Sequence, residues 1–201
     1  MANPIDERLK DISEIRSLME RSSKFLSLSG LSGVSAGIVA LCGAALAYWK
    51  TQQPEAANLT RELVHFLVAD AALVLTVAVS LTVFFSIRLA KKKNLPFWTN
   101  TAKYLLADLV IPLIAAGILL AILYKQGVLI YLAPLCLVFY GLALLNASKY
   151  TFRAVRYLAI SEIILGLLAT ALLDWQLWFW AFGFGILHIV YGIFGYWKFE
   201  K

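Results

Sequence analysis

Six runs of roughly 20 mostly apolar residues restrict the fold of this chain more than any other feature of its sequence. About 20 such residues make a helix long enough to cross the hydrocarbon core of a bilayer. Only 15% of the residues are charged, whereas soluble domains carry about 25%. The sequence therefore predicts an all-α, polytopic membrane protein. Its six transmembrane helices are expected at about 25–49, 62–87, 103–124, 128–148, 156–173 and 177–199.

The segment before the first apolar run has a different pattern. Asn3 and Pro4, followed by Asp6, are typical of a helix start. Apolar residues then recur at spacings of three and four, and five acidic side chains balance five basic ones. We expect residues 1–24 to form an amphipathic helix on the cytoplasmic membrane surface, ahead of one transmembrane domain over 25–201. A docking surface for a partner protein or a second protomer is the alternative, because the polar face carries both charges.

The connections and their charges predict the topology. The segments at 50–61, 125–127 and 174–176 suggest three helical hairpins. Of the 18 lysines and arginines, 15 fall on one side of such a bundle, and only Lys50, Arg61 and Lys125 fall on the other. The positive-inside rule then predicts a multi-pass protein of the cell membrane with both termini in the cytoplasm.

Small residues form stripes on two of the predicted spans. Such stripes let two helix backbones approach closely in lipid. The last span has Ala181, Gly185, His188, Gly192 and Gly195 at spacings of four, three, four and three, and the first span has Ser29, Gly33, Gly37, Ala40, Ala44 and Ala47. The sequence therefore predicts helix packing through Gly33, Gly37, Gly185, Gly192 and Gly195, and it leaves open whether the neighbouring helix belongs to the same chain.

Several polar side chains are expected inside the membrane near its cytoplasmic side. At about 1.5 Å per residue, Asp108 and Glu162 lie roughly 8–9 Å deep and His188 roughly 15 Å deep. Ionisable groups at such depths usually face a bundle interior, because exposure to lipid is costly. We expect His188, Glu162 and Asp108 to share one interior space. The further members of this predicted site are Asn146, Tyr191 and Ser29.

Two readings of these polar residues remain open, a functional one and a structural one. As a functional site, the cluster would be a polar cavity for small-solute binding or transport, or a proton-linked site. As a structural feature, it would consist of interhelical hydrogen bonds. The protein could instead be a non-transporting membrane sensor, scaffold or assembly partner that uses its N-terminal helix.

A remote alternative is an intramembrane serine hydrolase. The sequence GLSG at 30–33 resembles the GxSG motif of rhomboid proteases, in which the serine is the nucleophile. In that family the motif lies in a middle span, whereas here it opens the first span. Ser32 is the only residue that the resemblance would assign a catalytic role.

Other chemistry finds little support in the sequence. Two histidines and two cysteines do not have the spacing of a metal site, and no nucleotide-binding fingerprint is present. We therefore expect no metal, no cofactor and no nucleic acid. The expected partners are the lipid bilayer, a small-molecule ligand, and either a second copy of the chain or another membrane protein.

Both ends of the transmembrane region resemble a known group of proteins. MERSSKFLSLSGLSG at 19–33 and LHIVYGIFGYWKFEK at 187–201 look like small bacterial six-span membrane proteins of no known activity. The resemblance implies a bacterial inner membrane and brings no activity with it. The layout is also similar in size to the substrate-binding subunits of energy-coupling vitamin transporters, and an analogy of size does not establish function.

Overall fold

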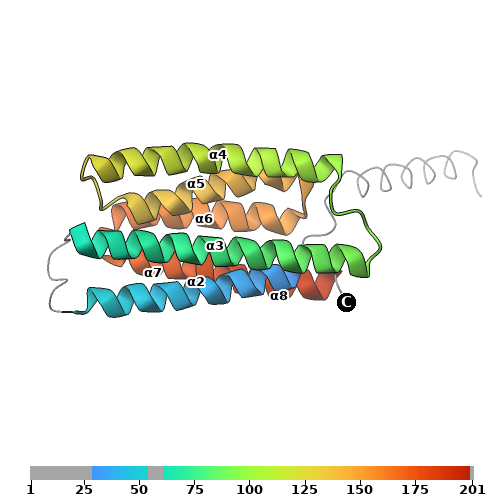
Figure 1. Ribbon diagram of the computed structural model, residues 1–201, viewed down its shortest axis with the longest axis horizontal. Helices are drawn as coiled ribbons and strands as arrows, with labels where there is room; N and C mark the ends of the chain where they lie inside the picture. The colour runs from blue at the N-terminus through green and yellow to red at the C-terminus, as the bar shows by residue number, and fades with distance from the viewer. Residues whose placement is uncertain (1–28, 54–60, 200–201) are drawn as a thin grey trace, which may run out of the picture.

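The computed structural model describes residues 29–53 and 61–199 (Figure 1). It contains six helices long and apolar enough to cross a membrane, which confirms the all-α six-span fold. The amphipathic helix predicted for 1–24 lies outside the described residues.

The spans run alternately up and down the bundle, so that α2 begins at the end where α8 finishes (Figure 1). We call this end of the bundle the Ser29 end and the opposite end the Thr51 end. The first five spans are α2 (Gly30–Thr51), α3 (Arg61–Lys92), α4 (Asn100–Lys125), α5 (Leu132–Ala147) and α6 (Arg153–Ala171). A short turn of 3₁₀-helix, η2 (Ser148–Tyr150), joins α5 to α6. The sixth span consists of η3 (Leu173–Trp175), α7 (Gln176–Trp180), η4 (Ala181–Leu187) and α8 (His188–Phe199).

The second span is longer than the sequence predicted. The helix α3 continues through the basic run and ends only at Lys92, because cationic side chains are favourable in the last turn of a helix. Asn94 then adopts a left-handed conformation (φ 51°), and the amide of Leu95 bonds to the carbonyl of Ala90 at 2.9 Å. This arrangement terminates a helix and reverses the chain. Gly127 (φ 78°) ends α4 in the same way.

The packing of the helices distinguishes a central group from an outer group. The helices α2, α5, α6 and the sixth span have the larger buried fractions, whereas α3 and α4 are mostly exposed to the surroundings of the bundle. The outer helix α3 packs along α2, and α4 packs along α5. Because α5 also packs extensively along α6, and α2 along α8, the division into three hairpins stays a prediction.

The small-residue stripe of the first span meets that of the last span within the same chain. A Cβ atom added to Gly33 would lie 3.0 Å from Cα of Gly192. One added to Gly37 would lie 2.5 Å from the carbonyl oxygen of Gly185. Both distances are below ordinary van der Waals contact, so a larger residue at either position would push the two backbones apart. The question that the sequence left open is therefore answered in favour of an intramolecular neighbour.

Glycines also bring α5 and α6 into close contact. A Cβ atom on Gly141 would lie 2.8 Å from the carbonyl oxygen of Ala159, and one on Gly166 would lie 2.7 Å from the backbone nitrogen of Val138. Gly141 directly follows Tyr140 in the chain. This close approach therefore brings the Tyr140 region of α5 against α6, the helix that carries Glu162.

The sixth span is interrupted where the sequence predicted a continuous α-helix. Residues Ala181–Leu187 form a π-helical segment, which is wider than an α-helix and is frequent at functional sites. It begins after Trp180 and ends at His188. Because of the interruption, residues of the sixth span contact different helices. Gly192 packs against α2, whereas the ring of His188 lies against α5 and α6.

Candidate functional site

His188 lies at the centre of a buried polar cluster that joins three spans. Its side chain is 8% exposed. Its Nε2 atom lies 2.7 Å from the Tyr140 hydroxyl of α5, and its Nδ1 atom lies 3.0 Å from the carbonyl oxygen of Gly183 in η4. The same Nδ1 atom lies 3.5 Å from Oε1 of Glu162 in α6. The structure thus brings together two of the predicted site residues, His188 and Glu162.

The Gly183 carbonyl determines which ring nitrogen of His188 carries a proton. A carbonyl oxygen can only accept, so Nδ1 must be protonated and must donate to it. In the neutral ring, Nε2 then accepts a hydrogen bond from the hydroxyl of Tyr140. If Nε2 gains a proton, the bond to Tyr140 reverses direction, since a phenol oxygen can also accept. The cluster can therefore take up a proton without losing its contacts.

Glu162 is fully buried, and its carboxyl group lacks hydrogen bonds within the described residues. Its contact with His188 Nδ1, at 3.5 Å, is longer than a normal hydrogen bond. Burying a carboxyl group without hydrogen bonds is costly, so this position is not explained by packing alone. Gly183 provides the space, because a Cβ atom there would lie 2.5 Å from Oε2 of Glu162.

A row of aromatic rings leads from this cluster towards the Thr51 end. The Phe184 ring has its centroid 6.1 Å from that of His188 and 5.0 Å from that of Tyr140. The Trp180 ring follows, 5.0 Å from that of Phe184. Because Phe184 belongs to the π-helical segment and Trp180 directly precedes it, a rearrangement of that segment would move both rings.

Asp108 does not share the space of His188 and Glu162, contrary to the prediction. Its carboxylate lies 3.7 Å from Nζ of Lys149, and its main-chain carbonyl accepts a hydrogen bond of 3.2 Å from the Asn146 side chain. Lys149 also donates to Oδ1 of Asn146 at 2.7 Å. Asp108 is on α4, and α4 packs along α5 and η2. The predicted single cluster is therefore two separate polar groups.

The remaining predicted site residues are Tyr191 and Ser29. Tyr191 is on α8, one turn beyond His188, and forms no hydrogen bond with another described residue. Ser29 precedes α2, and its carbonyl accepts a hydrogen bond of 2.5 Å from the Ser32 hydroxyl.

The hydrogen bond from Ser32 to Ser29 also bears on the alternative of an intramembrane serine hydrolase. The Ser32 hydroxyl donates to Ser29, and the two ring nitrogens of His188 contact Tyr140 and Gly183, so Ser32 does not pair with His188.

Tyr140 and Gly183 are the members of the cluster that the sequence did not identify. Tyr140 is one of nine tyrosines, and its position eight residues before the end of the predicted span at 148, roughly 12 Å deep, is the signal that could have identified it. Gly183 is one of three glycines in the 183–192 stretch of the last span, and helical periodicity places it off the small-residue stripe. Its distance of five residues from His188 is the available signal, because a π-helical turn brings such residues together.

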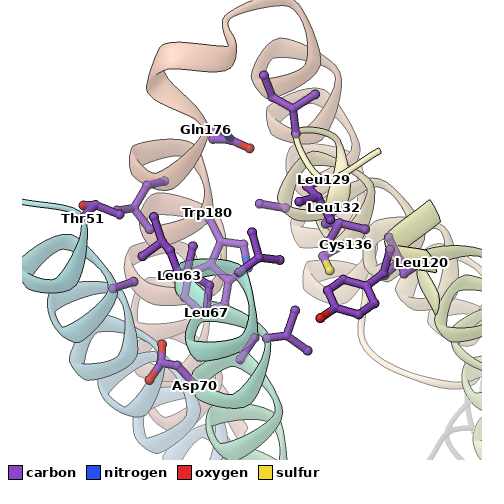
Figure 2. A pocket seen from close by; sticks show the side chains of 18 of the residues that line it. Thr51, Leu63, Leu67, Asp70, Leu120, Leu129, Leu132, Cys136, Gln176 and Trp180 are labelled. Atoms are coloured by element: carbon purple, nitrogen blue, oxygen red, sulfur yellow. The ribbon is translucent and has the colours of Figure 1, made fainter. Parts of the chain in front are cut away.

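A cavity of about 530 Å³ lies in the half of the bundle near the Thr51 end. The sequence placed the expected cavity in the other half, with His188 and Glu162, and this cavity is a different one. Figure 2 shows its walls, with Asp70 at one end and Gln176 at the other. Most of its lining is apolar and comes from α2, α3, α4, α5 and α7. Representative members are Ala44, Leu63, Leu67, Leu120, Ala133 and Trp180.

Small residues account for the cavity, because their side chains do not fill the space between the surrounding helices. A Cβ atom on Gly117 of α4 would have no atom within 4 Å. Ala44 and Ala47 of α2, which continue the predicted small-residue stripe, face the same space.

Two polar groups in the cavity wall lack partners. Asp70 of α3 lies over Gly43 of α2, where an added Cβ atom would be 3.4 Å from its Oδ2 atom, and it forms no hydrogen bond or ion pair with another described residue. The hydroxyl of Tyr124 is buried and has no hydrogen-bond partner among the described residues. The Tyr124 ring lies 5.7 Å from that of His65, which links α4 to α3 above the cavity. Unpartnered polar groups in an apolar pocket are typical of ligand sites.

Comparison with known proteins adds no family to this description. No protein-family model matches the chain, and neither a curated protein nor a solved structure matches it. Within residues 29–53 and 61–199, no three histidine, cysteine, aspartate or glutamate side chains come together as metal ligands. Any function must therefore be argued from the cavity and the buried cluster.

Proposed function

We propose that this membrane protein binds a small solute in the cavity near the Thr51 end and transports it. The cavity carries this proposal. Its volume of about 530 Å³ falls within the range of ligand pockets, about 300–1,000 Å³. Its lining is apolar apart from a few polar groups, as is usual for sites that enclose a small molecule.

The relation of the cavity to the buried cluster favours transport over binding alone. Transport requires groups that respond in both halves of the membrane. Trp180 lines the cavity and contacts Phe184, and Phe184 contacts His188 in the other half of the bundle. A change in the protonation of His188 or Glu162 could therefore be transmitted to the cavity wall through the π-helical segment of the sixth span.

The proposed orientation follows from the distribution of charge. We place the Ser29 end in the cytoplasm of a cell membrane, because the basic residues gather in the segments at that end. The cavity would then lie in the outer half of the bilayer, and the His188 cluster would lie on its cytoplasmic side.

The test of solute binding compares two substitutions of equal size on α4. Gly117→Phe should fill the cavity without a clash, because no atom lies within 4 Å of the position of its Cβ. Ala115→Phe adds the same side chain at an exposed position outside the cavity lining. Each protein is purified in lipid nanodiscs from cell membranes, extracted, and compared with empty nanodiscs by mass spectrometry.

We expect a small molecule to be enriched with the wild-type protein and with Ala115→Phe, and to be lost in Gly117→Phe. Equal recovery from all three proteins would contradict the proposal. A non-transporting scaffold would have no occupant to lose, and therefore gives that contradicting result.

A second experiment tests the proton-linked role of the cluster. Infrared difference spectra between two pH values report protonation changes of buried carboxyl groups. We expect the wild-type protein to show such a change, Glu162→Gln to lack it, and Asp108→Asn to retain it. Identical spectra for the wild-type protein and Glu162→Gln would show that Glu162 takes no part in proton exchange.

A further inference from the structure

Among the described residues that line the cavity, Asp70 is the only charged one. The 21 residues that line the cavity include no lysine, arginine or histidine. On α3 the nearest described lysine or arginine is Arg61, nine residues earlier and roughly 14 Å along the helix, on the opposite helix face. The carboxylate thus faces apolar side chains, and the described residues of the wall offer no cation to offset its charge.

This placement favours a positively charged occupant. An ionised carboxylate inside a membrane is costly unless it is paired or wetted, and a bound cation supplies the missing charge. The aromatic faces of Trp180 and Tyr124, which belong to the same wall, also attract cations. The unpartnered hydroxyl of Tyr124 can accept a hydrogen bond from a protonated amine.

The rest of the lining requires that this cation be largely apolar. The wall is built mainly from leucine, valine, alanine and isoleucine side chains, which offer nothing to a hydrated inorganic ion. Val68 and Ile130, which line the cavity, are 46% and 40% exposed, so the cavity is continuous with the outer surface of the bundle. A ligand dissolved in the bilayer could reach it there.

We infer that the cavity binds a hydrophobic organic cation, with the carboxylate of Asp70 as its counter-ion. The inference rests on the proposed function and adds the chemical class of the solute. The cationic centre lies next to Asp70, and the apolar body extends along the wall towards Gln176, at the other end of the cavity in Figure 2.

The experiment uses two probes of nearly the same size and shape and of opposite charge. Tetraphenylphosphonium is the cation and tetraphenylborate is the anion. Binding of each probe to the full-length protein in lipid nanodiscs is measured by equilibrium dialysis, with empty nanodiscs as the background. The variants are Asp70→Asn, which removes the charge, Asp70→Glu, which keeps it, and Asp108→Asn, which removes an acid outside the cavity.

The expected result is saturable binding of tetraphenylphosphonium and none of tetraphenylborate. Asp70→Asn should weaken the binding of the cation about tenfold or more, because a charged partner is lost in an apolar site. Asp70→Glu and Asp108→Asn should retain it. A thermal unfolding curve for each variant separates loss of binding from loss of folding.

Three results would overturn the inference. The first is binding of both probes that Gly117→Phe abolishes and Asp70→Asn leaves unchanged. It would leave the proposed solute site standing, with Asp70 acting as a neutral group. The second is the absence of saturable binding of tetraphenylphosphonium to the wild-type protein. The third is saturable binding that persists in Gly117→Phe, which would place the cation outside the cavity.

Discussion

Asn146 of α5 donates a hydrogen bond of 3.2 Å to the main-chain carbonyl of Asp108 in α4. This carbonyl would normally accept from the amide of the residue four positions later, which is Pro112 and has no N–H group. In a bilayer no water replaces the missing donor, so a neighbouring helix must supply one. Asn146 therefore compensates for the proline, and its position is explained by the backbone of α4.

This relationship predicts that the effects of two substitutions are coupled. Asn146→Ala should lower the free energy of unfolding by about 1 kcal/mol, because the Asp108 carbonyl loses its donor. Pro112→Ala restores the helical amide, so in that background Asn146→Ala should lower the free energy of unfolding by clearly less. Unfolding in detergent, measured for the four proteins of the cycle, checks this. Equal costs of Asn146→Ala in both backgrounds would contradict the explanation.

The glycine contacts between α2 and α8 predict a graded series of stabilities. Gly33→Leu should destabilise the fold by about 1–3 kcal/mol or more, because its Cβ alone would lie 3.0 Å from Cα of Gly192. Gly195→Ala should be tolerated, since its Cβ would lie 3.6 Å from the nearest atom. Gly117→Leu is the matched control, because no atom lies within 4 Å of its Cβ position in the cavity. Thermal unfolding of the purified variants gives the order, and a Gly33→Leu protein as stable as Gly117→Leu would contradict the interface.

The close approach of Gly183 to Glu162 predicts a second coupled pair. Gly183→Ala should destabilise the protein by about 1–3 kcal/mol, because the new methyl group would lie 2.5 Å from Oε2 of Glu162. In the Glu162→Ala background the carboxyl group is gone, and the same substitution should cost less. Any destabilisation that remains is explained by the Leu137 side chain, which would lie 2.7 Å from the Cβ atom added at Gly183. A cycle with no coupling would show that Gly183 does not make room for the carboxyl group.

The orientation of the protein is tested by thiol labelling in intact cells. Both native cysteines, Cys42 and Cys136, are first replaced by alanine. A cysteine at Lys125 should then react with a membrane-impermeant reagent, whereas one at Lys92 should react only after the cells are made permeable. The reverse pattern would place the basic side of the protein outside and would contradict the charge argument.

The number and approximate limits of the spans could be predicted from the sequence because length and hydropathy decide them. The glycine interface was predictable in part, because the spacing of Gly33 and Gly37 marks a packing face. Its partner was not predictable, since a stripe does not state which helix covers it. The interruption of the last span was missed because a π-helical segment depends on tertiary contacts, such as those of His188 with Tyr140 and Glu162.

The candidate site was only partly predictable, for a physical reason. Position along a span places His188, Glu162 and Asp108 at similar depths in the membrane. It does not give the direction in which each side chain points. Asp108 is at nearly the expected depth of Glu162, yet it faces Lys149 on another side of the bundle. The cavity escaped prediction because it arises where small side chains such as Gly117 leave space between helices, and one helix alone does not reveal that space.

The central claim is that the cavity between the helices near the Thr51 end holds a solute, and a cryo-electron microscopy map in lipid nanodiscs tests it most directly. We predict a compact density, separate from the surrounding lipid, bounded by Asp70, Leu120 and Trp180 in the wild-type protein and absent in Gly117→Phe. A cavity closed by its own side chains in the wild-type protein, or one filled by an acyl chain continuous with the bilayer, would contradict the account.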